Sequence, residues 1–269
     1  MDALYNAAKP RVVAIGGPTA TGKTALSVAL AKRFGGEIIS ADSMQIYQGL
    51  DVGTAKVTPE EMQGVPHHLV GFLAPEQAFS VADFTTLAGK TITQLTAQGK
   101  LPLVVGGTGL YITSLLNGIG FTPGKVDPAI RQELQARLQA EGSQALYAEL
   151  AAVDPGYAAK VHPNNTPRVI RALELYRATG RKMSAEREAA RPAEKPYRSL
   201  CLCLTCRDRT LLYQRIDTRC DRMMQSGILE EAKLVYDHRD TYRTAAQAIG
   251  YKEFFPYFEG TADLESCLA

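Results

Sequence analysis

The sequence predicts an α/β fold, a parallel sheet flanked by helices, together with an all-helical insertion. Residues 11–17 are a β-branched run that ends in glycine, a helical pattern follows from Lys23 to Phe34, and a second apolar run covers residues 37–41. A strand, a glycine-rich loop, a helix and a strand in this order open a parallel α/β unit. From about residue 122 to residue 195 the pattern is helical, without a convincing strand.

This change of pattern divides the chain into two expected domains. Residues 1–121 and 196–269 are expected to form the core with the parallel sheet, and residues 122–195 the helical insertion domain. A third buried strand is predicted at "LPLVVGG", residues 101–107. Residues 51–79 are rich in glycine, proline and polar side chains, so we expect a long functional loop or a pair of loops there.

Composition and charge are typical of a globular enzyme, with 45% hydrophobic and 22% charged residues. No apolar run approaches the ~20 residues of a membrane span, and the first residues lack the apolar core of a signal peptide, so a cytoplasmic protein without a membrane partner is expected. The net charge of +2 neither requires RNA nor excludes it. The cysteines of "CLCLTC" (201–206) alternate in a way that fits a buried strand better than a zinc site.

The strongest local motif is "GPTATGKT", which satisfies G-x-x-x-x-G-K-[ST] between a strand and a helix. In such a loop the backbone N–H groups and the helix N-terminus converge on phosphate oxygens. We expect Lys23 to reach the terminal phosphate and the Thr24 hydroxyl to bind Mg²⁺. The motif therefore predicts a P-loop NTPase-like core that holds a diphosphate or triphosphate. The expected phosphate-binding residues are Gly17, Pro18, Thr19, Ala20, Thr21, Gly22, Lys23 and Thr24.

A single carboxylate, Asp42, follows the second predicted strand in "SADSMQIY". The carboxyl ends of parallel strands are where α/β folds bind ligands. Asp42 could accept a proton from an attacking nucleophile while the P-loop holds the leaving phosphates. A simple turn or helix-cap aspartate is the alternative.

Several further motifs occur in order along nearly the whole chain. They are "DSMQIY", "GTAK" (53–56), "VPHHLV" (65–70), "VGGTGLY" (105–111), "RALELY" (171–176) and "IGYKE" (249–253). Together with the P-loop they resemble the bacterial tRNA dimethylallyltransferase (tRNA isopentenyltransferase) family. This combination is far more specific than the phosphate loop alone.

The resemblance implies that the P-loop holds dimethylallyl diphosphate and that the prenyl group is transferred to N6 of the adenosine 3′ of the tRNA anticodon. In that reading Asp42 takes the N6 proton, and Thr108 lies near the reacting groups unless it is a plain turn or cap. Contacts with the tRNA are implied at Asp42, Ser43, Met44, Gln45 and Thr108. The motifs do not separate dimethylallyl from a hydroxylated prenyl donor.

Negative charge grows on diphosphate as its C–O bond breaks, so fixed positive groups lower the barrier. Arg215, Arg219 and Arg222 are spaced i, i+4 and i+7 and share one helical face. We expect Arg219 to act in catalysis and Arg222 to contact the diphosphate, with the tRNA backbone as another possible partner for either. The alternative is a solvated face whose arginines pair with Asp217 and Asp221.

In the insertion the resemblance implies tRNA contacts at Arg131, Asn165 and Arg168. Asn165 departs from the family pattern, in which an aspartate is usual. The chain also stops at Ala269, whereas family members usually continue into a basic helical segment, so part of the tRNA clamp is expected to be missing.

Three other functions compete with this reading. An adenylate isopentenyltransferase would run the same chemistry on a free nucleotide, although AMP needs no helical insertion to hold an anticodon arm. A small-molecule kinase would turn over ATP. A non-catalytic RNA-binding protein would not need Lys23, Thr24 and Asp42. The favoured reading is a monomeric tRNA prenyltransferase that uses Mg²⁺.

Overall fold

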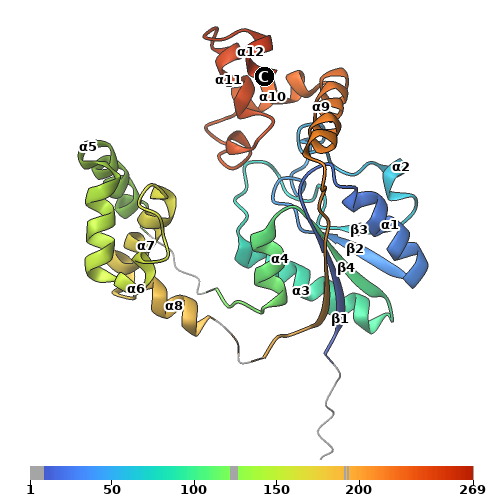
Figure 1. Cartoon of the computed structure of the whole chain (residues 1–269), viewed down its shortest axis with the longest axis horizontal. Helices are drawn as coiled ribbons and strands as arrows, with labels where there is room; N and C mark the ends of the chain where they lie inside the picture. Colours follow the sequence, from blue (N-terminus) through green and yellow to red (C-terminus); the bar gives the residue numbers. More distant parts are fainter. Residues whose placement is uncertain (1–8, 122–126, 191, 193, 269) are drawn as a thin grey trace, which may run out of the picture. The chain divides into compact units, whose positions relative to one another are not determined.

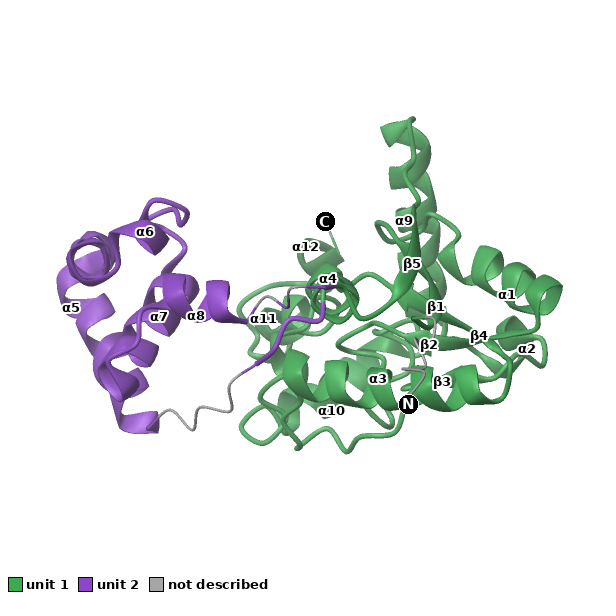
Figure 2. Cartoon of the chain, turned by 90° about the horizontal axis from the view of Figure 1, so that it is seen from below, with its two compact units in different colours: residues 1–117, 195–269 green, residues 118–194 purple. Residues whose placement is uncertain are grey.

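The computed structural model describes residues 9–121, 127–190, 192 and 194–268 (Figure 1). The chain forms two compact units, residues 1–117 with 195–269 and residues 118–194 (Figure 2). This division lies near the domain boundaries expected from the sequence, of which residue 122 lies outside the described residues. No helix in the described part of the chain is both long and apolar enough to cross a lipid bilayer.

The first unit is built on a five-stranded sheet in the order β3-β2-β4-β1-β5. All of its strand pairs are parallel. Gly16 at the end of β1 is level with Gly106 of β4 and Cys203 of β5, so the carboxyl ends of these strands meet at one edge. The strands predicted near residues 11, 37 and 101 are confirmed. The strand bounds are β1 Arg11–Gly16, β2 Gly36–Ser40, β3 His67–His68, β4 Leu101–Gly106 and β5 Arg198–Cys203.

Helices flank the sheet and continue beyond it toward the C-terminus of the chain. The α3 helix begins with a capping box in which Ser80 and Asp83 exchange side-chain and backbone hydrogen bonds. The helices of the first unit are α1 Lys23–Phe34, α2 Pro59–Met62, α3 Val81–Ala97, α4 Gly109–Leu116, α9 Arg209–Gln225, α10 Ile228–Asp237, α11 Phe255–Phe258 and α12 Leu264–Leu268, with 3-10 turns η1 Ala245–Gln247 and η2 Lys252–Phe254.

The expectation that residues 51–79 form loops is only partly correct. Thr58 and Glu61 form a second capping box with Pro59 in the first turn, which produces the short helix α2. The backbone of His67–His68 then pairs with Ile38 and Ile39 as the edge strand β3. Both elements are too short to leave a periodic signal in the sequence.

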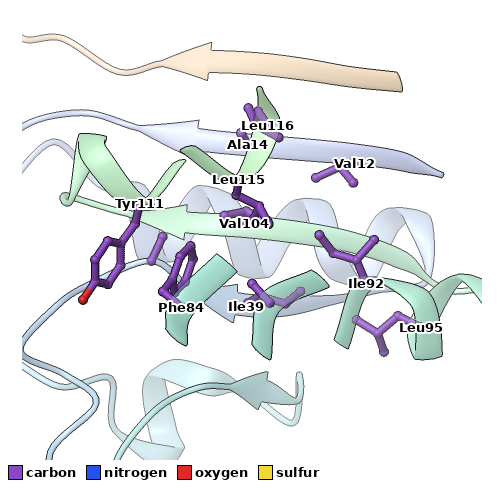
Figure 3. Close-up of a cluster of buried hydrophobic side chains, with 12 residues drawn as sticks. Val12, Ala14, Ile39, Phe84, Ile92, Leu95, Val104, Tyr111, Leu115 and Leu116 are labelled. Atoms are coloured by element: carbon purple, nitrogen blue, oxygen red, sulfur yellow. The ribbon is translucent and has the colours of Figure 1, made fainter. Parts of the chain in front are cut away.

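Each face of the sheet has its own hydrophobic core. On one face Val12, Ile39 and Val104 pack with side chains of α3 and α4, among which Phe84 and Tyr111 stack with ring centroids 4.4 Å apart (Figure 3). On the other face Ile15 and Leu103 pack against α1. Because successive side chains of a strand point to opposite faces, this two-sided burial explains the continuous apolar runs of the central strands.

The prediction that the cysteines of "CLCLTC" are buried is wrong, although the strand itself is confirmed. Cys201 and Cys203 are exposed, and Leu200 is 58% exposed. The physical reason is the position of β5 in the sheet. In the described structure β5 is an edge strand, which pairs with β1 on one side and with no strand on the other. The alternation of side chains predicts a strand, but it does not reveal which strands stand at the edge.

The second unit is helical, as the sequence predicts for this region. Its helices are α5 Pro128–Val153, α6 Pro155–Ala158, α7 Thr166–Thr179 and α8 Met183–Ala189. Helix α5 contains a break at Gly142, where φ is 81° and ψ is 171°. Leu134, Leu150 and Leu173 are among the buried residues of a core made by α5, α6 and α7.

We predict that Phe84→Ala lowers the free energy of unfolding by about 3–5 kcal/mol, because it removes a fully buried ring that stacks on Tyr111. Urea unfolding measures the change. The matched control is Phe34→Ala, since Phe34 is 61% exposed and its loss should cost no more than about 0.5 kcal/mol. Equal effects of the two substitutions would contradict the assignment of the core.

Candidate active site

The P-loop lies between β1 and α1 and has the backbone conformation that its glycines allow. Gly17 has a φ of 150° and Gly22 a φ of 86°. A side chain at Gly17 would collide with the backbone just after β5, because its Cβ would lie 2.5 Å from the carbonyl oxygen of Leu204. The Lys23 ammonium lies over the loop and donates to the carbonyl oxygens of Gly17 at 2.8 Å and Pro18 at 2.7 Å.

Two predicted site residues, Asp42 and Arg219, act electrostatically on a third, Lys23. Burial lowers the pKa of Lys23, the nearby Asp42 carboxylate opposes this effect, and the Arg219 guanidinium adds to it. These residues come from the P-loop, from the segment after β2 and from α9. The fold therefore brings Lys23, Asp42 and Arg219 together from distant parts of the sequence.

The two oxygens of Asp42 have different surroundings. Oδ1 accepts hydrogen bonds from the backbone N–H groups of Met44 at 2.9 Å and Gln45 at 3.3 Å, which closes a turn. Oδ2 forms no hydrogen bond with any described residue and lies beside Gly107. The turn role and the proposed base role are thus compatible, since one oxygen fixes the backbone and the other remains available as a proton acceptor.

Thr108 joins the Asp42 turn to the end of β4. Its hydroxyl accepts a hydrogen bond from the Ser43 N–H at 3.1 Å and lies 3.4 Å from the Ser43 hydroxyl. Its own N–H donates to the carbonyl oxygen of Ala41 at 3.2 Å. Thr108 also stands at the N-cap position of α4, where its carbonyl oxygen accepts from the helix but its side chain makes no cap hydrogen bond, so a turn or cap role stays the alternative to a role near the reacting groups.

Gln45 and Met44 lie within the protein rather than standing free. The Gln45 amide donates to the carbonyl oxygens of Thr54 at 3.3 Å and Ala55 at 3.0 Å, and its oxygen lies 3.4 Å from the Ser40 hydroxyl. Met44 packs beside the hydrophobic cluster of α10. A contact between Gln45 and adenine stays a prediction, and the observed hydrogen bonds give the side chain a structural task.

Helix α9 presents its arginines without ion-pair partners among the residues that the structure describes. Asp208 caps the helix by accepting from Thr210 N–H and Leu211 N–H, and none of its seventeen residues is buried. Within the described residues Arg219 and Arg222 form no salt bridge, so the pairing with Asp217 and Asp221 is not observed there. The cations of this helix remain available for anionic ligands.

Comparison with known proteins identifies the family. The sequence model described as IPP transferase matches residues 45–269, and the one described as isopentenyl transferase matches residues 10–70. The chain belongs to the IPP transferase family. It is 49% identical to the tRNA dimethylallyltransferase of Bacillus subtilis (strain 168), over 98% of this chain and 83% of that protein.

Solved structures of relatives share the fold. The tRNA isopentenylpyrophosphate transferase of Bacillus halodurans matches with a TM-score of 0.66 and 45% identity, covering 97% of this chain and 81% of that chain. A eukaryotic dimethylallyltransferase described as acting on tRNA matches with a TM-score of 0.78 and 32% identity, covering 96% of this chain and 65% of that chain. The α/β core with a P-loop is thus the fold of this IPP transferase.

The three predicted tRNA-binding residues of the second unit lie in different settings. Arg131 pairs with the fully buried Glu174, which raises the pKa of the arginine, and Arg171 approaches the same carboxylate. Asn165 stands at the N-terminus of α7 without a side-chain cap bond, and Arg168 is exposed in the first turn. Arg131 therefore stabilises a buried charge, and its contact with RNA stays a prediction.

Sequence reasoning missed a group of residues that lie around the Asp42 turn. Lys56, Glu231 and Tyr251 form hydrogen bonds that fix residues 47–53. The motifs "GTAK" and "IGYKE" contain two of these residues, but nothing in the spacing of the motifs shows that they meet.

We predict that Gly106→Ala lowers the free energy of unfolding by about 1–3 kcal/mol, because the added Cβ would lie 2.2 Å from the carbonyl oxygen of Ala41, just before Asp42. Gly109→Ala is the control, since a methyl group there meets nothing within 4 Å. It should be neutral or slightly stabilising in urea unfolding. A neutral result for Gly106→Ala would show that β4 and the Asp42 turn are not in close contact.

Proposed function

We propose that this protein transfers the dimethylallyl group of dimethylallyl diphosphate to N6 of the adenosine 3′ of the anticodon in tRNAs and releases diphosphate. The observation that carries the proposal is the meeting of Lys23, Asp42 and Arg219 at the P-loop of a member of the IPP transferase family. The names of the relatives support tRNA as the acceptor.

The reaction requires stabilisation of a leaving group. The bond between the prenyl C1 and the diphosphate oxygen breaks, and its electron pair stays on the diphosphate. Lys23, the P-loop N–H groups and Arg219 are arranged to stabilise the negative charge that grows there, and Arg222 lies one turn further along α9.

The acceptor side requires a base. The N6 electron pair forms the new C–N bond, and one N6 proton must leave. In this mechanism Asp42 Oδ2 accepts that proton, since it forms no hydrogen bond with any described residue. Oδ1 holds the turn meanwhile, so the base does not need to move.

A Mg²⁺ ion fits the P-loop through a limited set of protein ligands. Thr24 is exposed at the start of α1, and its hydroxyl forms no hydrogen bond within the described structure. No group of three or more acidic, histidine or cysteine side chains that could hold a metal is found among the described residues. Mg²⁺ commonly combines few protein ligands with phosphate oxygens and water, so Thr24 would hold it and the ion would neutralise diphosphate charge.

The tRNA must present an unstacked base to this site. Extrusion costs least in a single-stranded loop such as the anticodon loop. Ser43, Met44 and Gln45 line the turn of Asp42, and we assign contacts with the anticodon arm to Arg131, Asn165 and Arg168 of the helical unit.

Label transfer tests the proposed function directly. The protein is incubated with labelled dimethylallyl diphosphate and an anticodon stem-loop that has adenosine 3′ of the anticodon, with AMP in a parallel reaction. We expect label in the RNA and none in AMP. Label in AMP alone would overturn the proposal in favour of an adenylate isopentenyltransferase, and ATP turnover without prenyl transfer would indicate a kinase.

We predict that Asp42→Asn lowers kcat by about 100-fold or more and leaves the affinity for dimethylallyl diphosphate unchanged. Asparagine retains an oxygen that can accept from Met44 and Gln45 but does not act as a base, so it separates proton transfer from the turn. Single-turnover kinetics and calorimetry give the two quantities. Asp240→Asn, on an exposed residue, is the control, and near-normal kcat in Asp42→Asn would refute the base role.

A pH dependence of donor binding follows from the lowered pKa of Lys23. The protonated ammonium binds diphosphate, so affinity should fall as pH rises through a pKa below the usual lysine range. Calorimetry between about pH 7.5 and about pH 10 measures this fall. In Lys23→Arg the guanidinium stays charged, and affinity should remain constant over the same interval. Equal pH profiles would exclude Lys23 as the titrating group.

A further inference from the structure

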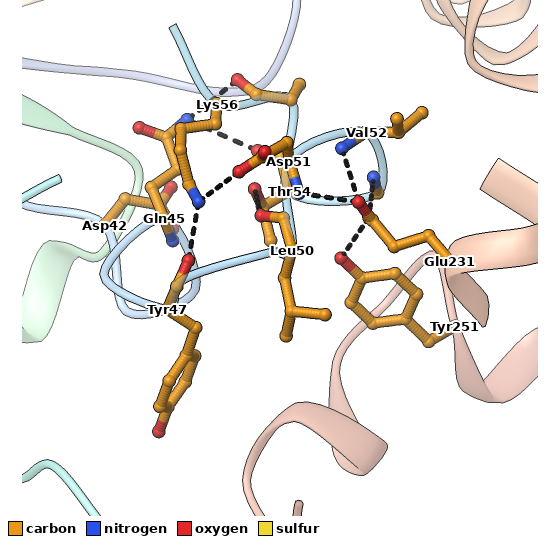
Figure 4. A network of polar contacts seen from close by, with 12 residues as sticks. Asp42, Gln45, Tyr47, Leu50, Asp51, Val52, Thr54, Lys56, Glu231 and Tyr251 are labelled. Carbon is orange, nitrogen blue, oxygen red and sulfur yellow. Dashed lines mark hydrogen bonds and ion pairs between the residues drawn. The ribbon is translucent and has the colours of Figure 1, made fainter. Parts of the chain in front are cut away.

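Glu231 on α10 binds a turn that lies far from it in the sequence (Figure 4). Its Oε2 accepts from the backbone N–H groups of Asp51 at 2.6 Å and Val52 at 3.0 Å. Its Oε1 accepts from the Gly53 N–H at 2.7 Å and from the Tyr251 hydroxyl at 2.7 Å. One carboxylate therefore holds three consecutive N–H groups and a phenol, and charge-assisted hydrogen bonds of this kind are strong.

Tyr251 makes this contact possible by its close packing on Gly53. Tyr251 is fully buried, and a Cβ on Gly53 would lie 2.3 Å from its ring. Burial, followed by the hydrogen bond to Glu231, raises the pKa of Tyr251. The ring of the tyrosine in "IGYKE" thus leaves space for no residue but glycine at the first position of "GTAK".

The same turn is joined to the segment that carries Asp42. The Gln45 side chain donates to the carbonyl oxygens of Thr54 and Ala55, directly after the residues held by Glu231. Lys56 donates to the carbonyl oxygen of Tyr47 at 2.5 Å and also pairs with the Asp51 carboxylate. Gln45 in turn donates its backbone N–H to Asp42 Oδ1 at 3.3 Å. A continuous series of hydrogen bonds therefore runs from α10 to the proposed base.

We infer that Glu231 is a positioning residue, which fixes the turn at residues 51–53 and thereby holds Asp42 in place through Gln45. The inference rests on the proposed function for its effect on catalysis, whereas the effect on the turn does not depend on it. If Glu231 only stabilised the fold, its substitution would lower the stability and leave proton transfer in the folded enzyme unchanged. If Glu231 positions Asp42, its substitution also lowers kcat of the folded enzyme.

Amide hydrogen exchange tests the contact without an activity assay. In Glu231→Gln one side-chain oxygen becomes an NH₂ group, which cannot accept from a backbone N–H; the Tyr251 hydroxyl can turn and accept from it, so at least one of the four hydrogen bonds is lost in either orientation. We expect peptides that cover residues 42–56 to exchange about tenfold faster, while peptides of β1 and β4 keep their protection. Glu230→Gln is the control, because Glu230 is exposed on the same helix. Unchanged exchange in Glu231→Gln would overturn the inference.

Kinetics then test the link to Asp42. Glu231→Gln should lower kcat about 10-fold to 100-fold with unchanged affinity for dimethylallyl diphosphate, and Tyr251→Phe, which loses one of the four hydrogen bonds and keeps the ring, should have a smaller effect. If Glu231 acts through Asp42, the losses are not additive, and Glu231→Gln costs little in the Asp42→Asn background. Additive losses, or a full kcat in Glu231→Gln, would overturn the inference.

Two controls keep the outcomes distinct. If Glu231→Gln does not fold, Tyr251→Phe replaces it in both experiments, and unchanged exchange and kcat in that variant would overturn the inference. If the wild-type protein transfers no prenyl group, the proposed function fails, and the exchange rates alone decide whether Glu231 holds the turn.

Discussion

The level ends of parallel strands determine where the chemistry of this protein can take place. Gly16 of β1 and Gly106 of β4 share a register position, and the backbone of Ala41, just after β2, lies against Gly106. The P-loop begins at the first of these ends and the Asp42 turn at the last. Because backbone contacts without side chains hold the strand ends together, the distance between phosphate loop and carboxylate is set by the sheet rather than by flexible side chains.

Electrostatics builds on this geometry. An ammonium, a carboxylate and a guanidinium lie close enough to change the pKa of Lys23, and burial strengthens such interactions relative to water. In the proposed mechanism the Asp42 carboxylate divides its two oxygens between structure and chemistry. This division lets one small turn provide both rigidity and a reactive group, whereas a separate cap and base would need two acidic residues in the same space.

The sequence was sufficient to predict those parts of the structure that depend on local residue pattern. The P-loop, the strands near residues 11, 37 and 101 and the helices of the insertion follow from periodicity, glycine placement and motif context. Burial of Cys201 and Cys203 was mispredicted because edge position depends on strand order. The backbone partners of Glu231 lie about 180 residues away in the sequence, and the ion pair of Arg131 with Glu174 joins α5 to α7. Contacts of this kind have no local signal, so only the fold reveals them.

The contacts of Lys23 have a consequence for how tightly any phosphate can be held. Its ammonium already has two carbonyl acceptors from its own loop, Gly17 and Pro18. A phosphate oxygen that binds this ammonium must displace those carbonyl oxygens. The binding free energy contributed by Lys23 is therefore the difference between its hydrogen bonds to phosphate and its hydrogen bonds to the loop. The same internal contacts restrict the conformations of the Lys23 side chain, which reduces the conformational entropy lost when phosphate binds. In the proposed reaction diphosphate leaves after every turnover, and the carbonyl oxygens of the loop then replace it as hydrogen-bond partners of Lys23.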